Sequence, residues 1–169
     1  MNIKMTLKIL CLHGFRHNST LLKRSMESIT KKLRKLGVEF DFFESPILYS
    51  GDDNNDNSKD FKQWWSATKE TVQSQEKYDT LEQSIENLKV KWQNYKYDGI
   101  IGYSQGSVLV QIFAYMIQNK IIDTYEPKFL ILSSTFPITD VRYKDLYKEK
   151  LRYPTIIMAG TNDTFVKIF

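Results

Sequence analysis

The chain has 169 residues and a mass of 20.0 kDa, which is enough for one globular domain and too little for two of ordinary size. Hydrophobic residues make up 41% of the sequence and charged residues 26%, as in ordinary globular proteins, so a wholly disordered chain is excluded. The 24 Lys and Arg residues only slightly outnumber the 20 Asp and Glu residues, and they form no basic tract, which argues against nucleic-acid binding. We therefore expect a single domain over residues 1–169.

Cysteine content and hydropathy indicate the compartment. Cys11 is the only cysteine, so the chain cannot form an internal disulfide, as is typical of proteins from reducing compartments. Because it falls within an expected core strand, we expect its thiol to be inert. No apolar run approaches the roughly 20 residues of a membrane-spanning helix, and residues 1–5 carry no signal-peptide pattern. We therefore expect a cytoplasmic protein without a membrane span.

Two strands are predicted near the N-terminus. Residues 5–12 (MTLKILCL) form an apolar run that is too short for a buried helix and is typical of an interior strand of a parallel sheet. Residues 38–43 (VEFDFF) are rich in β-branched and aromatic side chains, and Pro46 follows them. With a helix between them, these strands form a βαβ unit.

One amphipathic helix is predicted between these strands, because apolar residues recur there at spacings of four and three. These residues are Leu22, Met26, Ile29, Leu33 and Leu36. Asn18 or Ser19 can cap the start of this helix, and Gly37 stands where a left-handed cap would end it.

Downstream of residue 79, helices and strands continue to alternate. Apolar residues follow a helical spacing at Leu81, Ile85, Leu88 and Trp92 in one segment, and at Val108, Ile112, Tyr115 and Met116 in another. Asp79 and Glu82 have the spacing of a capping box at the start of the first helix. Short buried strands are predicted over residues 98–102, 128–133 and 155–159. This alternation predicts a doubly wound α/β fold with a mostly parallel sheet.

A polar segment over residues 51–60 predicts a loop between the two halves of this pattern. Its aspartates are Asp52, Asp53, Asp56 and Asp60. The loop lacks the glycine at position six and the glutamate at position twelve of an EF-hand, so we expect a solvated loop and no metal site. Phe61, Trp64 and Trp65 follow, and they fit the wall of an acyl-binding pocket and the hydrophobic core equally well.

The strongest functional signal is the motif G-x-S-x-G at Gly102, Ser104 and Gly106, between a predicted strand and a predicted helix. A serine on such a turn is held in a strained backbone conformation that exposes its hydroxyl. The two glycines are required because the strand end and the helix start approach closely there. The motif predicts that Ser104 is the nucleophile of an acyl-transfer site, with the backbone N–H of Gln105 as one oxyanion donor. A chance motif at a strand–helix turn is the alternative.

A second oxyanion donor is expected from the segment His13-Gly14-Phe15, which follows the first predicted strand. The backbone N–H of Phe15 stands where that donor belongs, and Gly14 permits a close approach of the backbone. His13 could itself be a catalytic base, but a histidine beside an oxyanion loop more often braces the loop by hydrogen bonding. We therefore favour the bracing role.

Asp163 follows the last predicted strand, in the sequence GTND. A carboxylate at the carboxyl end of a parallel strand lies in the same crevice as the other strand-end loops. In a catalytic triad it would orient a histidine and stabilise the imidazolium. Since Asn-Asp is also common in turns, a purely structural turn is the alternative.

Together these motifs resemble the serine hydrolases of the α/β-hydrolase fold, and more narrowly the FSH1-type family that includes the ovarian tumour suppressor candidate 2 proteins. The resemblance covers almost the whole chain and rests on LCLHGFRHNS (residues 10–19), VEFDFFESP (38–46), the Trp64-Trp65 pair, DGIIGYSQGS (98–107) and YPTIIMAGTND (153–163). It implies an α/β-hydrolase-like sheet, Ser104 as nucleophile, Asp163 as triad acid, Phe15 and Gln105 as oxyanion donors, and no metal or organic cofactor.

The sequence departs from the family pattern after the acid. The family places a triad histidine beyond one more helix and one more strand, whereas here six residues follow Asp163, and His13 and His17 are the only histidines. The resemblance therefore implies a sheet that lacks the last helix and strand, with the strand over 155–159 at an exposed edge. Three explanations stay open: a C-terminally truncated chain, a partner chain that completes the sheet, or a base recruited from His13 or His17.

The expected function is hydrolysis of a small-molecule carboxylic ester or thioester through an acyl-enzyme on Ser104. A catalytically silent binding module that keeps the pocket is the main alternative, because the triad histidine has no counterpart. A half-enzyme completed by another chain is a third possibility, and a homodimer that covers the open sheet edge would be one form of it.

Overall fold

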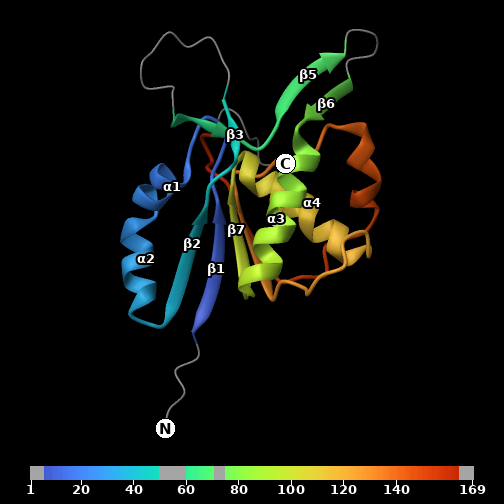
Figure 1. Cartoon of the computed structure of the whole chain (residues 1–169). Coiled ribbons are helices and arrows are strands. Elements are labelled where there is room, and N and C mark those ends of the chain that lie inside the picture. The colour runs from blue at the N-terminus through green and yellow to red at the C-terminus, as the bar shows by residue number, and fades with distance from the viewer. Residues whose placement is uncertain (1–5, 50–59, 71–74, 164–169) are drawn as a thin grey trace.

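The computed structural model describes residues 6–49, 60–70 and 75–163, which form a central sheet with helices on both faces (Figure 1). The five strands have the order β2-β1-β7-β8-β9, and every neighbouring pair is parallel. They are β1 (Leu7–Leu12), β2 (Val38–Phe43), β7 (Gly99–Tyr103), β8 (Phe129–Ser133) and β9 (Thr155–Met158). The prediction of a doubly wound, parallel α/β sheet is confirmed.

Helices cover the sheet on both sides because successive residues of β1 face opposite layers. Leu10 and Leu12 belong to the main core with α3 (Leu81–Tyr95) and α4 (Gln105–Gln118). Ile9 and Cys11 pack with Leu22 on the other face, where α1 (Ser19–Ser25) and α2 (Glu27–Arg34) lie. Figure 1 shows these two helix pairs on opposite sides of the sheet. A 3-10 helix, η2 (Val141–Lys148), also packs against α4.

Two small antiparallel pairs lie at the end of the sheet where the parallel strands finish (Figure 1). One joins β3 (Ile47–Leu48) to β4 (Lys62–Gln63), and the other joins β5 (Ser66–Glu70) to β6 (Gln75–Asp79). Neither pair was predicted. Strands β3 and β4 have two residues each, too few to show a period of two, and the sequences of β5 (SATKE) and β6 (QEKYD) are mostly polar and show no apolar alternation. Of the predicted polar loop, residues 51–59 lie outside the described residues, and with them Asp52, Asp53 and Asp56.

The prediction of a single helix after β1 is wrong in one respect: the chain forms two helices, α1 and α2, which meet at Met26. That residue has φ −91° and ψ 0°, outside the helical range, and so rotates the following turn. Leu22 and Met26 pack against the sheet as predicted, but Ile29 is 54% exposed. Thr30 is buried in its place, so the apolar face changes register at the break.

The caps show which local signals decided the helix boundaries. Asn18 caps α1, since its Oδ1 accepts a hydrogen bond from the Leu21 amide at 2.8 Å. Ser19, the alternative cap, instead donates its hydroxyl to Glu44 at 2.7 Å. Gly37 has φ 89°, as a left-handed helix end requires. Both the N-terminal cap and this C-terminal glycine were anticipated.

The capping box predicted for α3 is wrong. Thr80 precedes the helix with φ 65° and makes no side-chain cap hydrogen bond. The Glu82 carboxylate accepts instead from Arg142, at the start of η2. A long-range ion pair therefore takes the place of the local capping hydrogen bond. The predicted apolar face of α3 is confirmed, because its four residues are buried: Leu81, Ile85, Leu88 and Trp92.

Strand β9 forms one edge of the sheet, and within residues 6–49, 60–70 and 75–163 its only neighbour is β8. Its apolar side chains are exposed, with Ile156 at 58%, Ile157 at 66% and Met158 at 47%. Ile157 faces the α4 side, as its pairing with buried Leu132 requires, whereas Ile156 and Met158 face the other side. The expected exposed edge is therefore present.

Replacing Asn18 by alanine should lower the free energy of unfolding by about 1 kcal/mol, because the Leu21 amide loses its acceptor. Chemical denaturation monitored by circular dichroism measures this change. The matched control is Asn94→Ala, an exposed position within α3, where alanine is the better helix former and no loss is expected. Equal destabilisation of both variants would contradict the capping role.

Candidate active site

Ser104 occupies a strained turn between β7 and α4. Its backbone has φ 50° and ψ −119°, a conformation that is rare for any residue other than glycine. Hydrogen bonds on both sides of the residue hold it there: its amide donates to the Ser133 carbonyl at 2.8 Å, and its carbonyl accepts from the amide of Ser107 at 2.9 Å and from the Ser107 hydroxyl at 2.5 Å. Its side chain is half-buried. The strained conformation expected for Ser104 is therefore present.

The glycines on either side of Ser104 stand where backbone segments nearly touch. A Cβ atom on Gly102 would lie 2.3 Å from the Cα of Ser107, and one on Gly106 would lie 2.3 Å from the carbonyl oxygen of His13. Both distances are far inside van der Waals contact. The steric role assigned to these glycines thus has a direct geometric basis.

The loop after β1 lies beside Ser104 because β1 and β7 are neighbours in the sheet, with Leu12 paired to Gly102. A Cβ on Gly14 would lie 3.2 Å from the Cβ of Ser104. The strand order reverses at β1, since β2 lies on one side of it and β7, β8 and β9 lie on the other. This is the switch point at which doubly wound sheets bind their ligands.

The two expected oxyanion donors belong to the segments that meet at this switch point: Phe15 follows Gly14 in the loop after β1, and Gln105 follows Ser104. Gln105 is the first residue of α4, so its N–H belongs to the unpaired, positive end of the helix. Among the described residues, neither amide has a hydrogen-bond acceptor. The Phe15 side chain is 46% exposed and packs edge-on against Tyr49. Both groups are thus available to an incoming acceptor.

His13 is fully buried and uses both ring nitrogens within the fold. Its Nδ1 lies 2.8 Å from the Gly14 carbonyl and must carry the proton, because a carbonyl can only accept. Its Nε2 then accepts from the Ser45 amide at 3.2 Å. Burial lowers the pKa of His13 and keeps the ring neutral, so Glu44, 3.3 Å from Nε2, forms no ion pair at neutral pH. This arrangement is the one that the bracing role requires.

His17 lies nearby but makes no corresponding contact. Its ring centroid is 6.2 Å from that of Tyr103, and Nδ1 is buried without a hydrogen-bond partner in the described part of the chain. Its backbone pairs with Lys62 in both directions. Within residues 6–49, 60–70 and 75–163, no hydrogen bond joins the Ser104 hydroxyl to His13 or His17.

Asp163 is the last described residue and follows the edge strand β9. Its amide donates to the Gly160 carbonyl at 3.1 Å and closes a turn. Because β7, β8 and β9 are parallel neighbours, Asp163 and Ser104 follow their strands at the same edge of the sheet. The side chain of Asp163 is half-buried.

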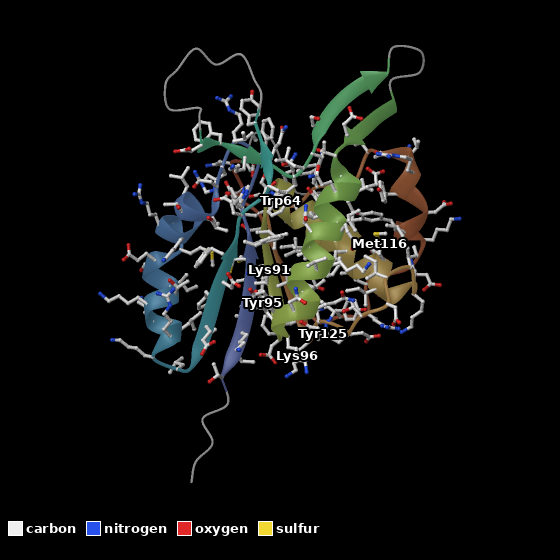
Figure 2. All side chains as sticks on the ribbon, viewed as in Figure 1. Trp64, Lys91, Tyr95, Lys96, Met116 and Tyr125 are labelled. Carbon is white, nitrogen blue, oxygen red and sulfur yellow. The ribbon has the colours of Figure 1, made fainter. Side chains whose placement is uncertain are left out.

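Trp64 and Trp65 belong to the core, which decides between the two roles considered for them. Trp64 is fully buried and Trp65 is 3% exposed. Trp64 stacks on the His13 ring with a centroid distance of 4.9 Å. Figure 2 shows Trp64 at the upper end of the sheet, where the strands leading to His13 and Ser104 finish. The sequence did not predict the contact between Trp64 and His13, although the Trp64-Trp65 pair singled out this segment.

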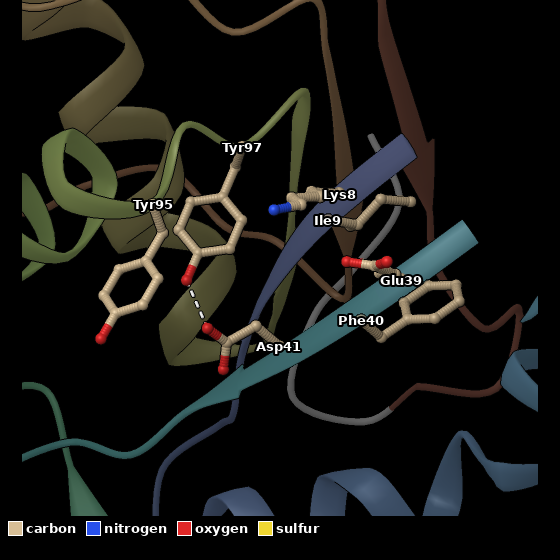
Figure 3. A pocket seen from close by; sticks show the side chains of 7 residues that line it. All are labelled: Lys8, Ile9, Glu39, Phe40, Asp41, Tyr95 and Tyr97. Atoms are coloured by element: carbon tan, nitrogen blue, oxygen red, sulfur yellow. Dashed lines mark hydrogen bonds between the residues drawn. The ribbon is translucent and has the colours of Figure 1, made fainter. Parts of the chain in front are cut away.

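A cavity of about 150 Å³ lies away from Ser104, at the opposite end of β1 (Figure 3). Its wall includes Lys8, Glu39 and Asp41, and the hydroxyl of Tyr97 donates a hydrogen bond to Asp41. Lys91 also pairs with Asp41 at 2.8 Å. In the described residues, no group of three or more His, Cys, Asp or Glu side chains could hold a metal ion.

The described helices include none with the length and apolar character needed to cross a membrane.

The chain is similar to known serine hydrolases and esterases. The family model described as serine hydrolase (FSH1) matches residues 1–168. An esterase of Anopheles gambiae is 26% identical over 95% of this chain, which spans 62% of the length of that relative. Esterase OVCA2 of Danio rerio is also 26% identical, over 95% of this chain and 78% of its own.

Solved structures share the architecture at low sequence identity. The crystal structure of Arabidopsis thaliana SOBER1 aligns with a TM-score of 0.50 at 14% identity, covering 92% of this chain and 88% of its own. The crystal structure of esterase PE8 gives a TM-score of 0.53 at 13% identity, covering 92% of this chain and 84% of its own. These likenesses establish the α/β-hydrolase fold.

Replacing Gly106 by alanine should lower the free energy of unfolding by about 1–3 kcal/mol, because the new methyl group collides with the His13 carbonyl. Thermal or chemical denaturation measures the change. Gly160→Ala is the matched control, since the nearest atoms to its Cβ lie 3.8 Å away, at ordinary contact distance. If both variants were equally stable, the close approach at Gly106 would be refuted.

Stability should decrease as the pH falls from about 7 to about 5.5. Burial lowers the pKa values of His13 and His17 in the folded chain. As the pH falls, these histidines therefore take up protons in the unfolded chain before they do so in the folded chain, near the ordinary histidine pKa of about 6.5. Each histidine can contribute at most about 1.4 kcal/mol per pH unit. Denaturation at several pH values should show a shallower dependence for His13→Gln than for the unaltered chain. An unchanged slope would mean that His13 is not held neutral.

Proposed function

Because the chain belongs to the FSH1 serine hydrolase family, we propose that it hydrolyses a small-molecule carboxylic ester or thioester through an acyl-enzyme on Ser104. The observation that carries the proposal is the strained backbone of Ser104 between β7 and α4. A serine in this setting projects its hydroxyl toward the strand-end crevice instead of into the helix. The esterase relatives support the same class of reaction.

In the proposed reaction, the Ser104 oxygen attacks the carbonyl carbon of the substrate, and a base accepts the proton of the hydroxyl. The negative charge that develops on the carbonyl oxygen is stabilised by the amides of Phe15 and Gln105 and by the positive end of α4. The alcohol or thiol leaves as the acyl-enzyme forms, and water then releases the acid. Asp163 is the proposed triad acid, which orients the base.

The acyl group is proposed to be uncharged. Two aromatic side chains from the segments next to Ser104 are partly exposed, Phe15 at 46% and Tyr103 at 42%. Apolar side chains at the mouth of a site favour a hydrophobic ligand group. We place this activity in the cytoplasm, as the lone buried Cys11 suggests.

One observation favours a second candidate function, a binding module that no longer turns over. Both ring nitrogens of His13 are engaged within the fold, and no hydrogen bond from His17 to Ser104 exists in the described segments. Without a base, a serine nucleophile can lose up to about 10⁶ in kcat. A partner chain that pairs with the exposed β9 edge could supply the missing group, as a homodimer would.

Incubation with a fluorophosphonate probe should label the chain at Ser104, and Ser104→Ala should abolish labelling. Ser133→Ala is the matched control, because Ser133 ends the neighbouring strand β8 and holds Ser104 through its backbone carbonyl alone. In-gel fluorescence measures the label. An unlabelled wild-type chain would refute the hydrolase and favour the binding module. Labelling that rises with protein concentration, with a dimer in sedimentation, would favour a completed half-enzyme.

A further inference from the structure

The two amides proposed as oxyanion donors belong to separate segments of the chain. Phe15 lies in the loop after β1, and Gln105 begins α4. Such a pair works only if both N–H groups lie within hydrogen-bond distance of the same developing oxyanion. The sheet pairing of β1 with β7 ends at Leu12 and Gly102, before these residues, so contacts beyond the sheet also bear on the spacing between the two segments.

A third segment, between β4 and β5, contacts both of them. The indole Nε1–H of Trp64 donates to the His13 carbonyl at 2.7 Å. The backbone N–H of Trp64 donates to the Gln105 Oε1 at 2.7 Å, and the Gln105 Nε2 donates to the Trp65 carbonyl at 2.8 Å. We call this set of three hydrogen bonds the Trp64 bridge.

The Trp64 bridge is shielded from water. Trp64 has no exposed surface, and Gln105 is 6% exposed. The remaining polar group of Trp64, its carbonyl, accepts a hydrogen bond from the Ser84 hydroxyl. A buried donor or acceptor that loses its partner is strongly unfavourable, because water cannot replace the bond. The bridge therefore resists small displacements of either segment.

The bridge also acts on the orientation of the Phe15 amide. A trans peptide group directs its C=O and N–H in opposite directions, so fixing the Gly14 carbonyl fixes the direction of the Phe15 N–H. That carbonyl accepts from the His13 ring, which stacks on Trp64 at 4.9 Å. Trp64 thus acts on the direction of the Phe15 amide indirectly, through the His13 ring. It acts on the Gln105 amide through its hydrogen bond to the Gln105 side chain.

We propose that Trp64 is a positioning residue for the oxyanion hole, holding the Phe15 and Gln105 amides at a fixed separation. This proposal rests on the proposed hydrolase function. It also assigns the Gln105 side chain a task distinct from that of its backbone N–H. Neither side chain contacts the reacting atoms, so the effect is one of geometry.

The test compares Trp64→Phe with Trp92→Phe. Phenylalanine keeps an aromatic ring at position 64 but removes the donor to the His13 carbonyl. Trp92 is the matched control, because it is also fully buried and its indole donates to a carbonyl, that of Tyr125, at 3.0 Å. Trp64→Phe should slow fluorophosphonate labelling about tenfold or more and lower kcat for a p-nitrophenyl ester more than it changes KM. Trp92→Phe should stay within about twofold of the wild type.

Amide hydrogen exchange supplies a readout that needs no turnover. In Trp64→Phe, exchange in peptides covering residues 13–16 and 105–108 should quicken relative to Trp92→Phe at matched stability. Should Trp64→Phe fail to fold, Gln105→Met removes two bonds of the bridge and leaves the tryptophan in place. An unreactive wild type would overturn the hydrolase, and the exchange data would still decide whether the bridge holds both segments. Equal labelling and equal exchange in Trp64→Phe and Trp92→Phe would overturn the positioning role.

Discussion

The close approach of two backbone segments, the end of β1 and the first turn of α4, is the constraint on which the rest of the site depends. The His13 carbonyl occupies the space where a Cβ on residue 106 would be. Only glycine allows this contact, and the contact brings the loop of Gly14 and Phe15 against the turn of Ser104. Parallel neighbours in the sheet make the approach possible, because both strands end at the same edge.

This close approach buries polar groups of both segments away from water, and neighbouring residues form hydrogen bonds with them. The His13 carbonyl, its imidazole and the Gln105 carboxamide are all hydrogen-bonded, mainly to the segment around Trp64 and to Ser45. Such fully satisfied networks hold one arrangement of a core. The half-buried Ser104 lies just outside the network, with a strained backbone but no hydrogen bond to its hydroxyl from the described residues.

The two ends of the sheet therefore differ in character. At the end that carries Ser104, the parallel strands finish and the small antiparallel pairs lie (Figure 1), with the loop of Gly14 against the strained serine. At the other end, Asp41 is held by Tyr97 and Lys91, and this contact lowers the pKa of the Asp41 carboxyl in spite of its partial burial. A fold of this kind serves many functions. The proposal of hydrolysis rests on the first end and on the family to which the chain belongs.

The sequence by itself determined the five strands of the parallel sheet, their alternation with helices along the chain, and the positions at which chemistry is expected. Apolar runs such as residues 5–12 and glycines such as Gly102 and Gly106 act through local sterics and periodicity, which are visible in one dimension. For the same reason Asn18 and Gly37 mark the ends of the first helical segment correctly. Serine between two glycines at a strand–helix turn needs no tertiary information to be recognised.

Tertiary structure decided the features that depend on partners distant in sequence. Arg142 attracts Glu82 away from the predicted capping box, and Met26 breaks a helix whose periodicity continues through it. The contacts of Trp64 with His13 and Gln105 join residues 51 and 41 positions apart. No pattern of spacing contains such pairs, because they arise only when separate elements pack against the same end of the sheet.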